Sequence, residues 1–576
     1  MSVFSQTKTA KPAVQPVQPN RKMIIYQMMV RLFGNKDTVN KFNGSVEENG
    51  TGKFNDVNDK ALDGLKKLGI SHVWYTGCIE HATMTDYSSF GIKQDDPDIV
   101  KGRAGSPYAI KDYYDVDPDL AIDVNKRMAE FESLVKRTHA HKLKVIIDFV
   151  PNHVARTYHS DVKPESVRNF GEDDDVSQAF SPANDFYYIP GKRFRVPKGV
   201  DAGGREFNNP MKDGRFDEYP AKATGNNVFK ENPSIDDWCE TVKLNYGVDY
   251  QYNKSHFETM PPVWLKMKDI LVFWAKKKVD GFRCDMAEMV PVEFWNWVIP
   301  EVKKINPKII FIAEAYDQTQ YIKYLTLGKF DYLYDKVGLY DSIKKLIRNE
   351  PGASTDSITH ITQQQRNFAS HMLRFLENHD EERIASNGFA GNPWYAIPAM
   401  VLTTTLSSGP AMIYFGQEVG EPGAGREGFG GDDNRTTIFD YWGVPEHQKW
   451  MNKGEFDGAL LSDDQKKLRD FYSTLLNYSA NSEAIRSGQL VELAGIDAFA
   501  KNNYAFIRYT PARRILVAVN FDREKSFTTS IKLPASLSSQ EKITVKEILS
   551  GKTSKVDLSG GFPVDVPAMG AVIFEF

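Results

Sequence analysis

The chain has 576 residues, of which 26% are charged, and a formal net charge of −4 at pH 7. A single hydrophobic core stops growing at roughly 250–300 residues, so this length predicts more than one domain. The weak net charge excludes the strongly basic surface of a protein that binds nucleic acid or an anionic membrane. No apolar run approaches the roughly 18 residues that a membrane-spanning helix needs.

The N-terminal and cysteine patterns exclude two further classes. Residues 1–21 contain no apolar signal core, and their VQPVQP segment predicts a flexible, extended spacer. Cys78, Cys239 and Cys284 fit neither a disulfide framework nor a zinc site. We therefore expect a soluble protein, either cytoplasmic or exported without its signal in this chain, and the sequence leaves the oligomeric state open.

The first part of the chain alternates apolar runs with helical periods. In one such period Leu62, Leu65 and Leu68 recur at helical spacing before Gly69. Near-continuous apolar strands separated by helices predict parallel strands that helices cover. The predicted strands are 23–33, 71–76 and 143–150, and the predicted helices are 60–69 and 128–140.

The alternation stops after His153 and resumes near residue 251. Residues 154–250 are rich in Asp, Asn, Gly, Pro and Tyr and are too many for a loop, which predicts a small inserted domain. Further strands are predicted at 279–285, 308–314, 372–377 and 411–415, with helices at 264–278 and 292–304. The pattern predicts an eight-stranded parallel (β/α)8 TIM barrel, whose active site lies at the carboxyl ends of the strands.

A last helix, at 463–478, precedes a change of character near residue 488. Alternating β runs then continue to Phe576 and predict a C-terminal antiparallel β-sandwich domain. The expected organisation is a flexible extension (1–21), a catalytic barrel (22–153 and 251–485), an inserted domain (154–250) and the C-terminal β domain (486–576).

The chemistry centres on the stretch VDGFRCDMAE, residues 279–288. Side chains alternate faces along a strand, so Arg283 and Asp285 point the same way at the end of this one. A cation and an acid on one buried face must pair with each other, because burying an unpaired charge is costly. The pair is either a structural ion pair or an ionised nucleophile with its guanidinium partner, and the stretch alone leaves both readings open.

Other predicted strands also end in polar residues that can do chemistry. They are Asp148 to His153, Glu314, and the Glu-Asn-His-Asp segment 377–380. Strand ends converge around a barrel, so several carboxylates and two histidines would share one pocket. Sheet interiors exclude acids, which makes this placement improbable without a function.

At this point the chain resembles the α-amylase family of glycoside hydrolases, of the family-13 type. The resemblance lies in four segments that occur in order: DFVPNH (148–153), GFRCDMA (281–287), AEA (313–315) and NHD (378–380). The inserted region and the trailing β domain match the family's B and C domains. The resemblance implies a retaining hydrolase that cleaves α-glucosidic bonds through a covalent intermediate.

The resemblance also implies a role for each matched residue. Asp285 would be the nucleophile, and Glu314 would protonate the leaving oxygen and then activate water. Asp380 would hold sugar hydroxyls and stabilise the cationic transition state. Arg283 would keep Asp285 ionised, and the two charges that it sits between would help to hold Glu314 protonated.

Three further residues would bind the sugar that is cleaved. The resemblance implies that His153 and His379 hydrogen-bond its hydroxyl groups and that Tyr108, in the segment SPYAIKDYYDVDP, stacks on its ring. Other aromatic residues could line the cleft, although core packing is the simpler expectation for each of them: Trp238, Trp394 and Tyr316.

Departures from the family pattern bear on substrate and metal. Glu288 and Met289 stand where many α-amylases have a Lys-His pair, and Lys243 stands where an acid is common. Many members bind calcium between the barrel and the B domain, and Asn152 is the only motif-matched ligand here. We expect the Lys243 ammonium to take the place of the ion, so that no metal or other cofactor is required, although calcium remains possible.

Three functions follow in order of expectation. The first is hydrolysis of mainly α-1,4 bonds in starch-like glucans or malto-oligosaccharides, with the carbohydrate as the binding partner. The second is transglycosylation, or α-glucosidase action on short α-glucosides. The third, a non-catalytic glucan-binding protein, is disfavoured because all three acids are present. The sequence leaves open endo against exo action and α-1,4 against α-1,6 preference.

Overall fold

The computed structural model describes residues 20–493, 501–534, 537 and 541–576. Within them, eight parallel strands form one sheet in the order β15-β14-β13-β12-β5-β2-β1-β16. A parallel bridge between Arg374 and Ala411 closes this sheet into a barrel. The strands are β1 Ile24–Met29, β2 His72–Thr76, β5 Lys144–Phe149, β12 Gly281–Cys284, β13 Ile310–Ala313, β14 Tyr332–Tyr334, β15 Met372–Leu373 and β16 Ala411–Tyr414.

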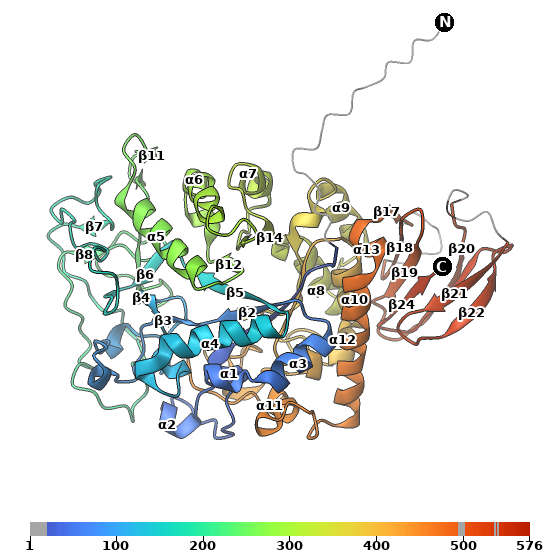
Figure 1. The fold of residues 1–576 in the computed structure, drawn as a ribbon, viewed down its shortest axis with the longest axis horizontal. Helices are drawn as coiled ribbons and strands as arrows, with labels where there is room; N and C mark the ends of the chain where they lie inside the picture. Colours follow the sequence, from blue (N-terminus) through green and yellow to red (C-terminus); the bar gives the residue numbers. More distant parts are fainter. Residues whose placement is uncertain (1–19, 494–500, 535–536, 538–540) are drawn as a thin grey trace, which may run out of the picture.

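Helices cover the outside of the barrel (Figure 1). The first of them shows how the sequence sets the bounds: Asn58 accepts the backbone N–H of Ala61 at its start, and Gly69 ends it with a φ of 104°. The covering helices include α3 Asp59–Leu68, α4 Arg127–Ala140, α5 Pro262–Lys276, α6 Val292–Lys303, α7 Tyr321–Thr326, α8 Asp341–Ile347, α9 Asp356–Gln364, α10 Ile397–Thr405, α11 Pro445–Met451 and α12 Asp463–Asn481.

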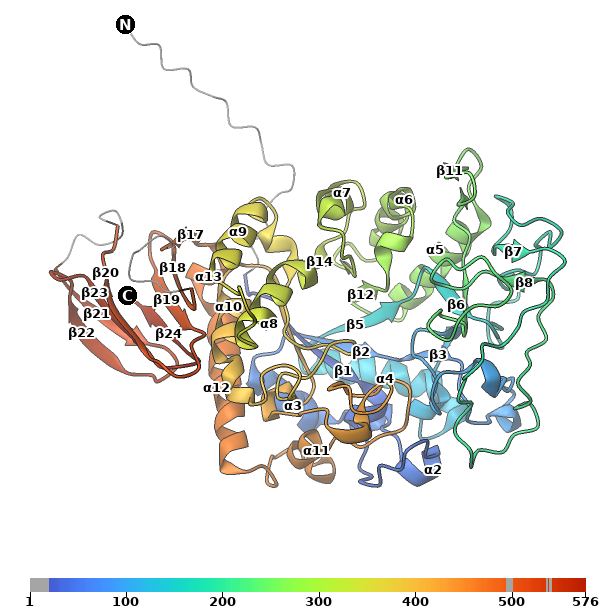
Figure 2. The same cartoon turned by 180° about the vertical axis from the view of Figure 1, so that it is seen from behind.

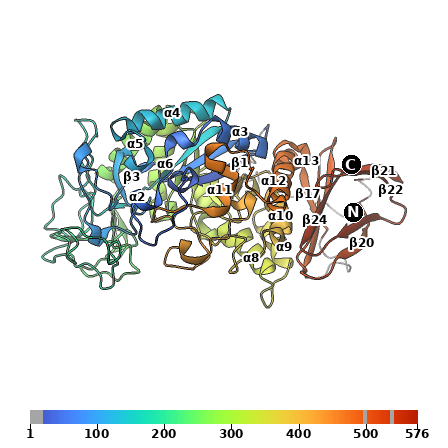
Figure 3. The same cartoon turned by 90° about the horizontal axis from the view of Figure 1, so that it is seen from below.

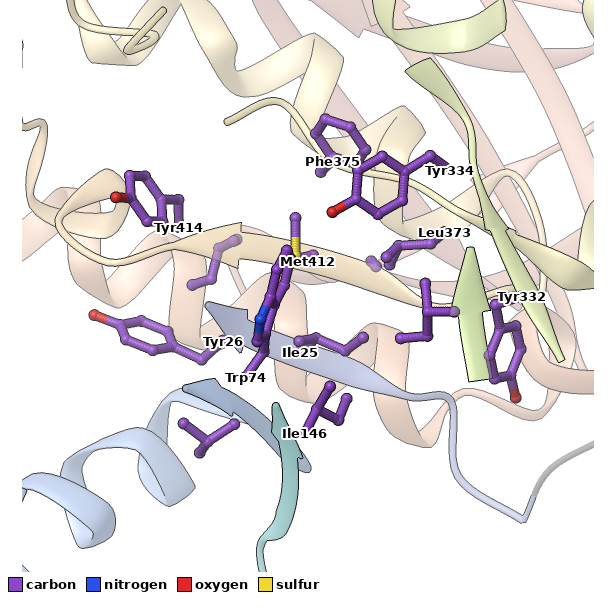
Figure 4. Close-up of a cluster of buried hydrophobic side chains, with 14 of the residues drawn as sticks. Ile25, Tyr26, Trp74, Ile146, Tyr332, Tyr334, Leu373, Phe375, Met412 and Tyr414 are labelled. Atoms are coloured by element: carbon purple, nitrogen blue, oxygen red, sulfur yellow. The ribbon is translucent and has the colours of Figure 1, made fainter. Parts of the chain in front are cut away.

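Large side chains fill the inside of the barrel. Figure 4 shows Ile25, Trp74 and Met412 meeting between their strands, and all three are fully buried. A filled barrel leaves no channel through its centre, so a substrate site must lie at one end. The predicted TIM-barrel fold class is confirmed.

Three strand predictions differ from the structure. The strand predicted at 23–33 ends at Met29, where the chain turns into the short helix α1 Val30–Phe33. The strand predicted at 372–377 is shorter in the structure: it consists of β15 and the bridge of Arg374 to Ala411. The eighth strand, β14, was not predicted at all, because three residues carry too little periodicity.

Two excursions leave the barrel before α5. The first pairs β3 Ile79–His81 with β4 Ile110–Val116. The second extends slightly beyond both ends of the predicted insertion 154–250 and contains three short antiparallel pairs: β6 His153–Ala155 with β9 Thr241–Lys243, β7 Tyr188–Ile189 with β8 Ala221–Lys222, and β10 Val248–Asp249 with β11 Lys254–Ser255. The pairing of β6 with β9 sets His153 opposite Lys243. The domain boundaries themselves stay predictions.

The C-terminal part is antiparallel, as predicted. One sheet has the order β17-β18-β19-β24-β21-β22, and a smaller one pairs β20 with β23. This C-terminal part lies at the opposite end of the molecule from the strands β6 to β9 (Figures 2 and 3). Its strands are β17 Gln489–Glu492, β18 Asn503–Tyr509, β19 Arg514–Asn520, β20 Phe527–Ile531, β21 Lys542–Glu547, β22 Thr553–Asp557, β23 Phe562–Val566 and β24 Gly570–Glu575.

One buried arginine ties this β domain to the barrel. Arg508 of β18 donates to the backbone carbonyls of Leu406, Ala484, Ile485 and Gly488, at distances from 2.7 to 3.0 Å. The carbonyls lie at the ends of α10 and of α13 Glu483–Ser487, where helices have unpaired acceptors.

Over the described ranges, every helix is too short or too polar to cross a bilayer.

Candidate active site

Arg283 is the centre of a cluster of carboxylates at the carboxyl ends of the barrel strands. It is fully buried on β12, and its Nη1 donates to Oδ1 of Asp285 at 2.8 Å and approaches Oδ1 of Asp148 at 3.4 Å. Its Nη2 lies 2.8 Å from Oε1 of Glu314, an ion pair in which the N–H is not aligned for a hydrogen bond. One guanidinium thus joins the ends of β5, β12 and β13.

Aromatic rings enclose this guanidinium. Its carbon lies 5.3 Å from the ring centre of Trp74, 5.3 Å from that of Tyr108 and 5.5 Å from that of Tyr334. Arg283 Nε also donates to the Tyr334 hydroxyl at 3.0 Å, and Trp74 Nε1 donates to Asp148 at 2.9 Å. Figure 4 shows Trp74 and Tyr334 inside the barrel. Cation–π attraction and burial therefore fix the position of the positive charge.

Asp285 differs in one respect from expectation. Arg283 was expected to keep it ionised, and the hydrogen bond is present. However, burial and the neighbouring Glu314 carboxylate raise the pKa of Asp285 well above its usual value and outweigh the guanidinium. Carboxylates that lie close together in a buried site raise one another's pKa, because each disfavours a second negative charge.

Glu314 follows β13, and its two oxygens have separate partners. Oε2 accepts the backbone N–H of Met286 at 2.7 Å, and Oε1 accepts the Tyr316 hydroxyl at 2.6 Å. Met286 has a φ of 41°, a left-handed conformation that is strained for a residue other than glycine. In this conformation the Met286 N–H points toward the Glu314 carboxyl group. Backbone strain of this kind is typical of active sites.

Asp380 and His379 follow β15. Asp380 is 40% exposed, and His379 Nε2 lies 3.0 Å from its Oδ2. Burial alone would raise the pKa of Asp380, but His379 and Arg283 lower it to about 2, so this carboxylate is ionised at neutral pH. The Gln27 amide nitrogen donates to His379 Nδ1 at 2.8 Å, which leaves Nε2 as the N–H that faces Asp380.

Tyr108 and His153 reach the site from the two excursions. Tyr108 stacks on His379 at 5.1 Å, and its hydroxyl lies 2.6 Å from Nε2 of that ring. His153 lies beside Trp238, with ring centres 5.3 Å apart. Burial and Lys243 lower the pKa of His153 to about 3, so the ring is neutral and suited to hydrogen-bonding a hydroxyl group.

A cavity of about 190 Å³ lies beside this cluster and is bordered by Tyr108, His153, Asp285, Glu314 and Asp380. Arg283 and His379 lie behind its wall, while Trp238 forms part of the wall and Trp394 instead donates to Asp464. One part of the cavity wall, formed by the segment between β16 and α11, was not predicted. The feature of the sequence that could have indicated this loop is the glycine-rich stretch 420–431. The lining residues are Lys101, Ser106, Tyr108, His153, Trp238, Glu240, Thr241, Asp285, Met286, Glu314, Asp380, Phe429, Ile438 and Phe439.

The residues around Asn152 do not fit the calcium ion that the family implies. Lys243 Nζ donates to Asn152 Oδ1 and approaches the carbonyl oxygen of Met289 at 3.3 Å. Calcium needs six to eight oxygen ligands, and here the Lys243 amino group already uses the side-chain oxygen that Asn152 would offer. Burial lowers the pKa of Lys243 to about 7. Within the described ranges, no group of three or more His, Cys, Asp or Glu residues is arranged to hold a metal.

We predict that calcium removal leaves the stability unchanged. The melting temperature in excess EDTA should match that in added calcium, because Lys243 Nζ already hydrogen-bonds the oxygens of Asn152 and Met289. Lys243→Ala is the matched variant and should melt lower in both buffers, because it leaves buried oxygens unpaired. A melting point that drops by many degrees on chelation, with stoichiometric calcium in the dialysed protein, would contradict the prediction.

The chain is similar in sequence to known proteins. The family model described as alpha amylase, catalytic domain, matches residues 39–472. Alpha-amylase 3 of Dictyoglomus thermophilum is 23% identical over 529 residues, 87% of this chain and 85% of that protein. Cyclomaltodextrin glucanotransferase of Paenibacillus macerans is 22% identical over 420 residues, 69% of this chain and 49% of that protein.

The fold is likewise shared with solved structures. An alpha-amylase from Geobacillus thermoleovorans, crystallised with acarbose, superposes with a TM-score of 0.60 at 20% identity. The match covers 96% of this chain and 98% of that one. At this identity the likeness concerns the fold. Because the family model spans most of the chain and its motif residues meet around Arg283, the chain belongs to the α-amylase family and contains that family's catalytic domain.

Proposed function

We propose that this protein is a retaining glycoside hydrolase that cleaves α-glucosidic bonds, mainly α-1,4, in starch-like glucans or malto-oligosaccharides. The observation that carries the proposal is the arrangement of Asp285 and Glu314 on two nitrogens of one buried guanidinium. Retaining enzymes separate their carboxyl groups by about 5–5.5 Å, and inverting enzymes by about 6.5–9.5 Å to admit a water. A shared guanidinium favours the shorter separation.

The first step requires a proton on Glu314. Glu314 gives this proton to the glycosidic oxygen while an Asp285 oxygen attacks the anomeric carbon, so the bond to the leaving sugar breaks as the bond to Asp285 forms. Asp380, ionised because its pKa is about 2, stabilises the positive charge that develops on the ring.

The second step returns the enzyme to its starting state. Glu314, now ionised, takes a proton from water as the oxygen of that water attacks the anomeric carbon and releases Asp285. A sugar hydroxyl in place of water would give transglycosylation, and the acceptor depends on the shape of the leaving-group side of the cavity. Because the chain is similar to a glucanotransferase, the product analysis is designed to detect transglycosylation as well as hydrolysis.

Product analysis tests the substrate class. Purified protein incubated with soluble starch, maltotriose and isomaltose should release shorter α-1,4 sugars from the first two and little from isomaltose. Products longer than the substrate would identify transglycosylation, and glucose as the first product from every substrate would identify α-glucosidase action. Absence of release from all three sugars would reject the proposal.

We also predict that the first-formed product is the α anomer. Two displacements at one carbon restore its configuration, whereas a single displacement by water inverts it. NMR of the anomeric proton during the first minutes of maltotriose cleavage measures the outcome before mutarotation. An initial β product would remove the covalent intermediate on Asp285 from the mechanism.

A further inference from the structure

We infer that Tyr316, held in place by Glu288, positions the carboxyl group of the acid/base Glu314. The inference rests on the proposed function, because it assigns two more residues to the same reaction. Neither residue had a role in the sequence analysis: Tyr316 was expected in the core or at the cleft, and Glu288 was noted only as a departure from the Lys-His pair of many α-amylases.

Tyr316 contacts Glu314 directly. It follows Glu314 by two residues after β13, and its hydroxyl donates to Glu314 Oε1 at 2.6 Å. Burial and the nearby Glu314 charge raise the pKa of Tyr316, so the hydroxyl keeps its proton and remains a donor. A hydroxyl that donates to a carboxylate makes one of the stronger hydrogen bonds in proteins.

Glu288 fixes the backbone that carries Tyr316. Its Oε2 accepts the backbone N–H groups of Tyr316 and Asp317, each at 3.0 Å. Glu288 itself lies in the short turn Ala287–Met289 that follows β12, and the Tyr324 hydroxyl donates to its carbonyl at 3.2 Å. Glu288 therefore connects the segment after the nucleophile to the segment after the acid/base.

Two hydrogen-bond donors and one cation around Glu314 define its orientation. Tyr316 and Arg283 approach Oε1, and the Met286 N–H approaches Oε2, so the carboxyl plane is fixed on both sides. Donors favour the ionised form of a carboxyl group, which is the form that acts as the base in the second step. The ionisable groups that face Glu314 from neighbouring elements are Asp148 on β5, Arg283 on β12, Asp285 after β12, Tyr334 on β14 and Asp380 after β15.

Tyr316→Phe tests the role by removing one oxygen atom. We expect kcat on maltotriose to fall about tenfold to a hundredfold, the cost of one charged hydrogen bond, with KM little changed. Because the variant lacks a donor to the ionised form, the acid form persists to higher pH. The alkaline limb of the kcat/KM profile should therefore move upward by about half a pH unit to one unit.

Tyr75→Phe is the matched control. It removes the same atom from a buried tyrosine on β2 whose hydroxyl lies 2.7 Å from Thr138 Oγ1 of α4, away from the cavity. It should lower the melting temperature slightly and leave the alkaline limb in place. Glu288→Ala should move the limb in the same direction as Tyr316→Phe, and Glu288→Gln, which keeps one acceptor oxygen, should restore most of the wild-type profile.

The outcomes separate this inference from the proposed function. If the wild type releases no sugar from any α-glucoside, the proposed function fails. If the wild type is active but Tyr316→Phe and Glu288→Ala keep its alkaline limb and lose only thermal stability, as the control does, the positioning role is overturned. If Tyr316→Phe does not fold, the two Glu288 variants decide by the same readout.

Discussion

Asp285→Asn should lower the turnover of maltotriose by about four to six orders of magnitude while the protein stays folded. The side-chain amide cannot form the covalent bond to the anomeric carbon, so the variant loses a reaction step and not only a contact. Its melting temperature should be at least that of the wild type. Burial and Glu314 raise the pKa of Asp285, so its charge opposes folding, and the uncharged amide relieves this repulsion.

Asp280→Asn provides a matched control at the opposite end of β12. Asp280 lies just before β12, far from the cavity, and pairs with His139 at 2.6 Å and Lys144 at 2.7 Å. This change should cost some stability and keep turnover within a factor of a few. Near-wild-type cleavage of starch by purified Asp285→Asn would reject the assignment of the nucleophile.

Glu314→Gln should show the second largest effect, and its size should depend on the leaving group. General acid catalysis contributes about 10² to 10⁴ in rate, and an activated aryl α-glucoside needs little protonation of its leaving oxygen. Glycosylation by maltotriose should therefore slow by about that factor, while glycosylation by the aryl glucoside changes much less. Pre-steady-state release of the phenol measures the glycosylation step directly.

The second step gives an independent check on Glu314. With the base removed, the glycosyl-enzyme should accumulate and be released faster when azide is added, because azide attacks without a proton transfer. The product should be the α-glucosyl azide. An equal loss of glycosylation rate on maltotriose and on the aryl glucoside would show that Glu314 is not the acid.

The local sequence determined the architecture wherever an element was long and strongly patterned. The apolar strand before Asp148, the strand GFRC and the amphipathic helix with Leu62, Leu65 and Leu68 were all predictable, because their periods follow from backbone geometry. The acids at the strand ends were equally visible, since a sheet interior excludes them unless they serve a function. The three-residue strand β14 carried too short a pattern to be predicted.

The pKa of Asp285 and the contacts that hold the other site residues in place depend on the tertiary structure and could not be predicted from the sequence. The expectation that Arg283 keeps Asp285 ionised followed from their adjacency, but burial and Glu314 proved stronger, and burial cannot be calculated from spacing. Tyr316, Glu288 and Gln27 acquire their roles from contacts across different strands, and Phe429 reaches the cavity from a glycine-rich loop. A sequence pattern records which face of an element is apolar. Which side chains then share a dry pocket depends on how the strand ends converge, because desolvation and charge act through space and not along the chain.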